Sequence, residues 1–126
     1  MLENKKVLIT GGTGSLGSAL TERLLETGVD AIRIYSRDEL KQTQMETKFN
    51  DKRLRFLIGD IRDKARLEKA VEDINIVIHT AALKQVPVIE YNPFEAIKTT
   101  VQGAQNLVDA CLEKDVEFAL AIGTDK

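Results

Sequence analysis

The sequence has little of what marks several large protein classes: one cysteine, no long apolar run and no excess of one charge. A single cysteine excludes an internal disulfide framework and fits a reducing, cytoplasmic setting. No apolar run approaches the roughly 18 residues of a membrane span. The strand-like run after the first residues leaves no room for a signal peptide. We therefore expect a cytoplasmic chain with no membrane association.

The charge balance excludes a second class of function. The net charge is −2 and both signs are interspersed along the chain. A nucleic-acid-binding domain carries a basic patch, so we expect no nucleic-acid partner. The composition, 43% apolar and 30% charged, is that of an ordinary globular domain. A length of 126 residues is room for one domain.

What the sequence does have is a regular alternation of short β-type runs and longer helix-type runs. Strands are expected at about 5–10, 31–36, 53–60, 74–82 and 117–123, and helices at 16–27, 38–49, 63–73 and 92–114. Asp63 is a plausible helix N-cap, and Gly28 fits a helix stop. The alternation predicts a doubly wound, Rossmann-like parallel sheet of five strands in the order 3-2-1-4-5, with helices on both faces. Residues 1–126 are thus interpreted as a dinucleotide-binding domain.

The stretch "TGGTGSLG" lies between the first expected strand and the first expected helix. Its glycines fit both Gly12-x-Gly14-x-x-Gly17 and Gly11-x-x-Gly14-x-x-Gly17. Glycines there allow a tight turn and let backbone N–H groups approach a pyrophosphate at the helix N-terminus. The candidate cofactor-binding residues of this stretch are Gly11, Gly14, Ser15, Leu16 and Gly17.

The end of the second expected strand bears on the choice of cofactor. NAD sites place an acidic residue there to bind the ribose 2′-hydroxyl. This chain has Ser36 and Arg37, with Lys41 one helical turn later. A hydroxyl and two cations suit a 2′-phosphate, so NADP is favoured over NAD. Asp38 lies close to these residues, so the sequence does not fully separate an NADP site from an NAD site. An alternative interpretation is that Arg37 and Lys41 are solvated charges at the start of a helix.

Further candidates follow the third and fourth expected strands. Asp60, beside Ile61, ends the third strand at a position that can reach an adenine amino group. Ala81 and Ala82 have small side chains that let a ribose and nicotinamide pass close to the backbone. His79, the one histidine, is interpreted as a packed, hydrogen-bonded residue rather than a base. No metal ligands are expected.

Taken together, these motifs resemble the extended short-chain dehydrogenase/reductases. The closest branch is the inverting UDP-N-acetylglucosamine 4,6-dehydratases of surface-polysaccharide synthesis. The resemblance covers all 126 residues. It is carried by "TGGTGSLG", "YSRDELKQ", "GDIRD", "HTAALKQVPVIEYNPFEAIKTT", "GAQNLVDAC" and the final "TDK". "SRDELKQ" and "ALKQVPVIEYNP" are specific to that branch, whereas the glycine loop marks only the superfamily.

The resemblance implies a reaction and the residues that perform it. Family members use tightly held NADP as a recycled hydride shuttle on a UDP-sugar, and they remove water across C5 and C6. By similarity Thr124 would bind near the C4 oxygen, Asp125 would protonate the leaving hydroxyl, and Lys126 would be the C5 base. Elimination next to a ketone needs one acid and one base. Lys84 would face the sugar nucleotide.

Three departures from the family pattern qualify this expectation. Gly123 stands where Ser is usual, Thr100 stands where Asn is usual, and the family's Tyr-x-x-x-Lys does not appear. We therefore expect this chain to be the cofactor-binding part of a dehydratase, without turnover alone. The alternatives are a stand-alone dinucleotide-binding or interaction module and part of a nucleotide-sugar epimerase. Self-association is expected through the edge of the last strand or through the helix at 92–114.

Overall fold

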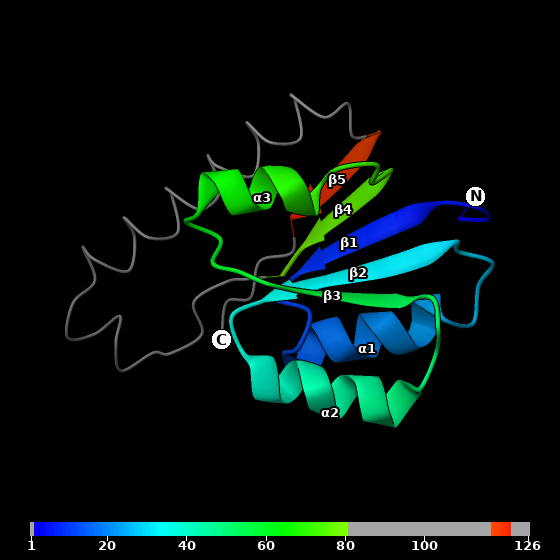
Figure 1. Ribbon diagram of the computed structural model, residues 1–126. Helices are drawn as coiled ribbons and strands as arrows, with labels where there is room; N and C mark the ends of the chain where they lie inside the picture. The colour runs from blue at the N-terminus through cyan, green and yellow to red at the C-terminus, as the bar shows by residue number, and fades with distance from the viewer. Residues whose placement is uncertain (1, 81–116, 122–126) are drawn as a thin grey trace.

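The computed structural model describes residues 2–80 and 117–121 (Figure 1). The strands are β1 (Lys6–Thr10), β2 (Ala31–Ser36), β3 (Leu54–Ile58), β4 (Ile76–His79) and β5 (Phe118–Ala121). The helices are α1 (Ser15–Leu24), α2 (Glu39–Phe49) and α3 (Lys64–Ala70). All adjacent strands pair in parallel, in the order β3-β2-β1-β4-β5. This confirms the doubly wound fold and the strand order predicted from the sequence.

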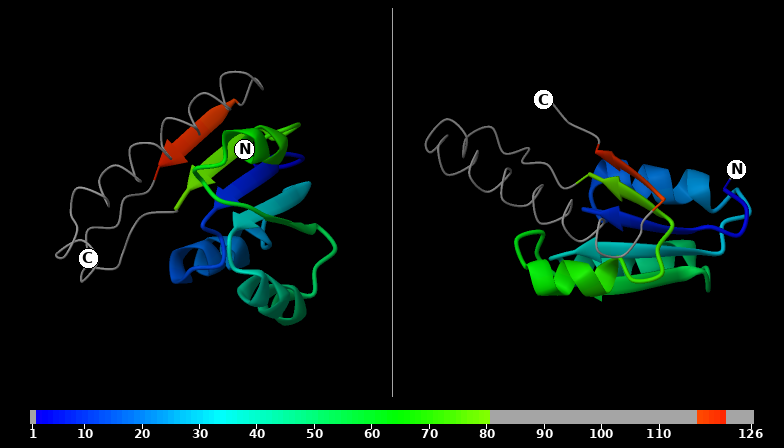
Figure 2. Two further views of the ribbon diagram at one scale, coloured as in Figure 1. Left: turned by 60° about the vertical axis from the view of Figure 1, so that its left-hand side comes forward. Right: turned by 90° about the horizontal axis from the view of Figure 1, so that it is seen from above.

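The sheet is covered on both faces, with α1 and α2 on one side and α3 on the other (Figures 1 and 2). The side chains of β1 alternate accordingly, because successive residues of a strand point to opposite faces. Val7 and Ile9 pack in the cluster with Leu24 of α1 and Met45 of α2. Leu8 packs in the other cluster, with Leu67 of α3. A central strand that is buried on both faces is what its unbroken apolar run predicted.

The helix boundaries follow local capping chemistry. The Asp63 carboxylate accepts a hydrogen bond from the Arg66 N–H, so the predicted cap of α3 is present. Asp38 caps α2 in the same way, through the Lys41 N–H at 3.0 Å. The helix expected at 38–49 therefore begins one residue later, because its first residue serves as the cap. The helix expected at 16–27 starts at Ser15 and ends at Leu24.

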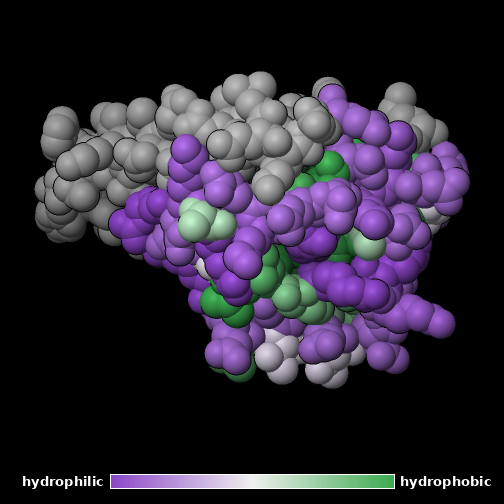
Figure 3. Space-filling model, turned by 45° about the horizontal axis from the view of Figure 1, so that its top comes forward, coloured by the Kyte–Doolittle hydropathy of each residue, from purple (hydrophilic) through white to green (hydrophobic). Residues whose placement is uncertain are grey.

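Two of the predicted strands are shorter than expected at the end that faces the candidate site. β3 stops at Ile58 rather than at 60, and β4 stops at His79 rather than at 82. Gly59 follows the strand and still donates its N–H to the Ser36 carbonyl at 2.9 Å, and the Tyr35 ring packs against it, since a Cβ at Gly59 would lie 2.5 Å from Tyr35 Cε1. The expected helix at 92–114 lies outside the described residues. Seen with the α3 side brought forward, most of the described surface is hydrophilic (Figure 3).

Candidate functional site

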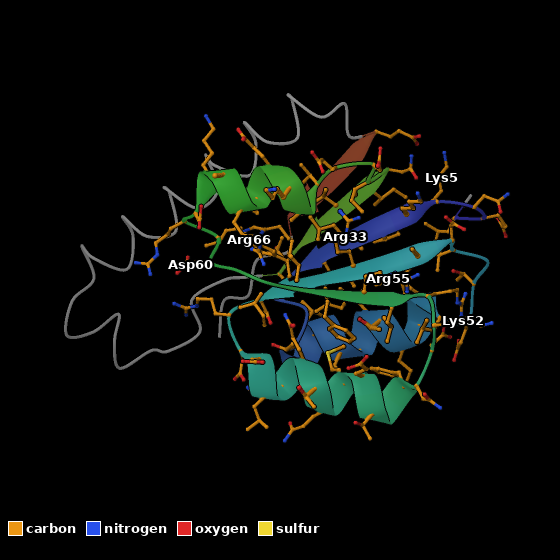
Figure 4. The ribbon with its side chains drawn as sticks, in the orientation of Figure 1. Lys5, Arg33, Lys52, Arg55, Asp60 and Arg66 are labelled. Atoms are coloured by element: carbon orange, nitrogen blue, oxygen red, sulfur yellow. The ribbon has the colours of Figure 1, made fainter. Side chains whose placement is uncertain are left out.

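The carboxyl ends of the parallel strands form one edge of the sheet, where α/β proteins bind their ligands. β1, β2, β3 and β4 end there at Thr10, Ser36, Ile58 and His79. Figure 4 shows Asp60 and Arg66 near this edge, with Lys5 and Lys52 toward the opposite edge. The loop after β1 lies between those after β2 and β4, so it is at the centre of the candidate site.

The fold itself requires two glycines of this central loop and one in the first turn of α1. Gly11 has a φ of 68°, a conformation that disfavours other residues, and its N–H donates to the Tyr35 carbonyl at 2.8 Å. A Cβ on Gly12 would lie 2.7 Å from Ile34 Cγ2. A Cβ on Gly17 would lie 2.5 Å from the Gly12 Cα. The first turn of α1 therefore packs directly on the backbone of the loop.

Gly14 is different, because nothing in the described fold needs a glycine there. Among the described residues, a Cβ at Gly14 would meet only the Gly11 carbonyl oxygen, at an ordinary contact distance of 3.5 Å. Its φ of −74° and ψ of 178° suit any residue. An explanation for the missing side chain is the close approach of a ligand to the backbone, the role of the middle glycine in dinucleotide-binding loops.

The N-terminus of α1 has the electrostatic character of an anion site. Gly14 is its N-cap, and no side chain of the described residues caps the helix or places an acidic group in its first turn. The first N–H groups of a helix have no partner within the helix and carry partial positive charge. The loop and first turn bring together the predicted residues Gly11, Gly14, Ser15, Leu16 and Gly17.

The side chains of Ser36 and Arg37, at the end of β2, have different contacts. The Ser36 side chain is buried, and its hydroxyl oxygen accepts a hydrogen bond from Gln42 Nε2 at 3.0 Å. The Arg37 guanidinium is exposed and lies 3.6 Å from the Asp60 carboxylate. Ser36 thus helps to fix α2 on the sheet, while Arg37 reaches toward the loop after β3.

Lys41 lies on the other side, where α2 faces the glycine loop and α1. It lines an open pocket of about 220 Å³. The residues lining the pocket are Thr13, Ser18, Lys41, Gln44, Met45 and Lys48. Two ammonium groups and two hydroxyls at one pocket suit an anionic ligand group. Lys41 and Thr13 therefore line one pocket, while Arg37 contacts Asp60.

Asp60 is held by arginines. Its carboxylate accepts hydrogen bonds from the Arg62 backbone N–H at 2.8 Å and from Arg62 Nη2 at 2.9 Å. These bonds, with the nearby Arg37 charge, lower the pKa of Asp60 to about 2, so the group is ionised at neutral pH. The Tyr35 hydroxyl donates to the Asp60 carbonyl at 2.7 Å, and burial raises the pKa of this phenol to about 12. Ile61 packs against the α3-side cluster.

His79 has the surroundings of a packed residue. Its Nδ1 lies 2.6 Å from the Thr10 hydroxyl oxygen. Burial lowers the pKa of the imidazole, so it is neutral at physiological pH. The next residue, Thr80, is also buried and hydrogen-bonded to the loop. These contacts agree with the interpretation of His79 as a structural residue.

Three supporting residues were missed by the sequence analysis. Arg62 had a signal, since it follows Asp60 by two residues in "GDIRD". Gln42 had none, because a glutamine on a polar helix resembles a solvated residue. Thr80 had none either, because its partners lie in the loop after β1.

Several predicted site residues cannot be placed. Ala81, Ala82, Lys84, Thr124, Asp125 and Lys126 lie outside the described residues. Within residues 2–80 and 117–121, no group of three or more His, Cys, Asp or Glu side chains could hold a metal ion. In the same part of the chain, no helix has the length and apolar character needed to cross a bilayer.

Comparison with known proteins agrees with this geometry. Residues 7–126 match the family described as "Polysaccharide biosynthesis protein". The chain belongs to this family. It is 54% identical to UDP-N-acetylglucosamine 4,6-dehydratase (inverting) of Campylobacter jejuni subsp. jejuni serotype O:23/36 (strain 81-176), over 100% of this chain and 38% of that protein. The resemblance drawn from the motifs is thereby confirmed.

Two further relatives widen the comparison. UDP-glucose 4-epimerase of Rickettsia rickettsii (strain Sheila Smith) is 43% identical, over 100% of this chain and 38% of that protein. The structure of DesIV, a dTDP-glucose 4,6-dehydratase from Streptomyces venezuelae with NAD and TYD bound, superposes with a TM-score of 0.78. It is 26% identical and is matched over 90% of this chain and 38% of its own. This chain thus spans 38% of the length of each of these two curated relatives, the dehydratase and the epimerase.

Proposed function

We propose that this chain is the dinucleotide-binding part of a nucleotide-sugar 4,6-dehydratase that acts on a UDP-sugar. The observation that carries the proposal is the loop after β1, where Gly14 is a glycine that the described fold does not require. The 54% identity to an inverting UDP-N-acetylglucosamine 4,6-dehydratase supports the choice of reaction.

The described residues fit a dinucleotide. Gly11, Gly14 and the first turn of α1 would bind the pyrophosphate through backbone N–H groups and the positive end of the helix. Asp60 and Ile61 would bind the adenine. By the family resemblance, Ala81 and Ala82, which lie outside the described residues, would make room for the nicotinamide ribose. When bound, the nicotinamide would supply the reversible oxidation of the sugar.

NADP is the proposed form of the cofactor. Lys41 supports this choice most directly, because it shares the pocket between α1 and α2 with Thr13 and Lys48. Arg37 would have to exchange its contact with Asp60 for one with the 2′-phosphate, or stay beside the adenine. DesIV, which has NAD bound, shows that NAD is the alternative to test.

The proposed chemistry rests on residues named from the sequence. Lys84 would bind the sugar nucleotide, and Thr124 would bind near the C4 oxygen. Asp125 would give a proton to the leaving C6 hydroxyl, and Lys126 would take the proton from C5. One acid and one base are what an elimination beside a carbonyl group requires.

Epimerisation is the second candidate, because the Rickettsia epimerase is 43% identical. An assay of the gene product, with any residues encoded beyond Lys126, separates the two reactions. Incubation with UDP-N-acetylglucosamine gives a product lighter by one water for a dehydratase. An epimerase gives a 4-epimer of unchanged mass.

Self-association is also proposed, through the β5 edge or the helix expected at 92–114. Within residues 2–80 and 117–121, β5 is the last strand in the sheet order, and an edge strand offers unpaired backbone groups to another chain. Sedimentation at several concentrations tests this. A species with the mass of one chain at all concentrations would contradict it.

The decisive experiment on cofactor binding is Gly14→Ser. Serine is a favourable N-cap, so this variant should be as stable as the wild type or slightly more so. Its side chain would occupy the space where we place the pyrophosphate. We expect dinucleotide affinity to fall about tenfold or more, measured by calorimetric titration, while the urea midpoint stays within error or rises.

Gly28→Ser is the matched control. It places the same side chain beyond the other end of α1, where the nearest atom is the flexible Glu3 side chain. Its affinity should equal that of the wild type. If the wild type binds neither NADP nor NAD, or if Gly14→Ser binds as tightly as the wild type, the proposed function is wrong.

A further inference from the structure

The end of β4 is hydrogen-bonded to the glycine loop through a buried hydroxyl. The Thr80 hydroxyl donates to the Thr10 carbonyl at 2.5 Å and is 3.1 Å from the Gly11 carbonyl. The Thr80 N–H also donates to the Thr10 carbonyl, at 3.0 Å, which continues the pairing of β4 with β1. The side chain is 8% exposed.

The Gly11 carbonyl joins this hydroxyl to the N-cap of α1. It accepts a hydrogen bond from the Gly14 N–H at 3.1 Å, so Thr80 and Gly14 meet at one oxygen atom. The Gly11 backbone is in a left-handed conformation, with a φ of 68°. Among the described residues, the Gly14 N–H and the Thr80 hydroxyl both contact the Gly11 carbonyl and so help to fix its direction.

A second contact fixes the strand ends beneath the loop. Thr10 is fully buried, and its hydroxyl lies 2.6 Å from Nδ1 of His79. The imidazole is neutral, because burial lowers its pKa. His79, the last residue of β4, and Thr80, which follows it, thus hold the side chain and the carbonyl of the same β1 residue.

We propose that Thr80 is a positioning residue for the dinucleotide pyrophosphate, acting through the Gly11 carbonyl on Gly14 and the first turn of α1. The inference rests on the proposed cofactor function of the loop. Thr80 itself touches no ligand in this account. Its hydroxyl holds the loop in the binding conformation before the ligand arrives, which lowers the ordering cost of binding.

Thr80→Val isolates the hydroxyl. Valine has nearly the same shape, favours strands as threonine does, and keeps the backbone N–H bond to Thr10. The substitution removes the hydroxyl that contacts the Thr10 and Gly11 carbonyls. Thr80→Ser restores the hydroxyl and serves as the rescue variant.

Thr27→Val is the matched control. The Thr27 hydroxyl donates to the Leu24 carbonyl at 2.6 Å, at the end of α1 away from the loop. Thr80→Val loses the hydroxyl's contacts with the Thr10 and Gly11 carbonyls, and Thr27→Val loses the bond to the Leu24 carbonyl, so both variants should be less stable than the wild type. A purely structural role for Thr80 predicts that the two variants bind dinucleotide equally well.

Two measurements test the proposal. Calorimetric titration with NADP and NAD should show about fivefold weaker binding of both cofactors by Thr80→Val, and near-normal binding by Thr80→Ser and Thr27→Val. Amide exchange by NMR without ligand should show faster exchange of the Gly14 N–H in Thr80→Val only.

The outcomes separate this inference from the proposed function. Unchanged Gly14 exchange in Thr80→Val overturns the inference whether or not the wild type binds a dinucleotide. An affinity loss no larger than that of Thr27→Val, or one that serine does not restore, overturns it as well. A wild type that binds neither cofactor refutes the proposed function, and the pyrophosphate role of Thr80 with it.

Discussion

The N-termini of the three described helices differ in one respect. In α2 and α3 an aspartate side chain closes the helix, with Asp38 accepting from the Lys41 N–H at 3.0 Å and Asp63 from the Arg66 N–H at 3.1 Å. In α1 the cap is Gly14, which has no side chain. A side chain thus satisfies one end N–H group in each of α2 and α3, whereas α1 presents its end groups, without a side-chain cap, at the centre of the site edge.

The difference shows which part of the fold serves stability and which serves binding. An aspartate cap contributes about 1 kcal/mol to stability, and the sequence forgoes such a cap at α1. Gly12 and Gly17 differ from Gly14, because close packing in the fold requires a glycine at both positions. Substitutions at the three helix starts should therefore separate stability from affinity.

Gly17→Ala should have the largest effect. Its Cβ would lie within 2.6 Å of three backbone atoms of Gly12, which cannot move without displacing α1 from the loop. We expect a loss of about 3 kcal/mol in the free energy of unfolding, measured with urea. A stable Gly17→Ala protein would show that α1 does not pack on the loop as described. Gly14→Ser, three residues earlier, provides the contrast.

Lys41→Met should have the next largest effect, on affinity alone. Methionine keeps the length and helix propensity of lysine but removes the charge at the pocket. NADP affinity should fall about tenfold, while NAD affinity stays unchanged. Lys52→Met is the control, because Lys52 is exposed and lies toward the opposite edge of the sheet (Figure 4). Equal losses of affinity for NADP and NAD would contradict the placement of the 2′-phosphate in this pocket.

Asp63→Ala should affect stability alone. Removing the α3 cap should lower the free energy of unfolding by about 1 kcal/mol and leave dinucleotide affinity unchanged. Asp63→Asn should restore most of the loss, since asparagine is an equally good cap. A clear fall in affinity with Asp63→Ala would mean that the α3 start also serves binding.

The pH dependence of stability should show the smallest effect. The pKa of Asp60 is lowered from 3.8 to about 2, mainly by the Arg62 side chain. Its contribution is therefore fully present above about pH 4 and is lost as the pH falls through about 2. Urea unfolding of the wild type should lose stability more steeply over this window than Asp60→Asn. Parallel curves for the two proteins would show that the arginine contacts do not lower the pKa.

Local patterns gave most of the fold. The strand order, the glycine loop and the Asp63 cap follow from apolar periodicity and from short motifs read within a few residues. The role of Asp38 was missed, since an acidic residue after β2 can be read as a cofactor ligand or as a cap. The hydrogen bond from the Tyr35 hydroxyl to the Asp60 carbonyl was missed too, because it joins β2 to the segment after β3, 25 residues later in the chain.

The candidate site was predicted less completely for the same reason. Thr80 contacts residues about 70 positions earlier in the chain, and no local pattern identifies such partners. Arg37 and Lys41 were grouped because they are close in sequence. The structure separates them, since one contacts Asp60 and the other lines the pocket with Thr13.

The most direct test of the account is an NMR titration of the chain with NADP, following backbone amides. We predict that the Leu16 and Gly17 amides at the start of α1 shift saturably with added NADP, while the Arg66 amide at the capped start of α3 does not. No shift at Leu16 and Gly17, or an equal shift at Arg66, would contradict the claim that the uncapped helix is the anion site.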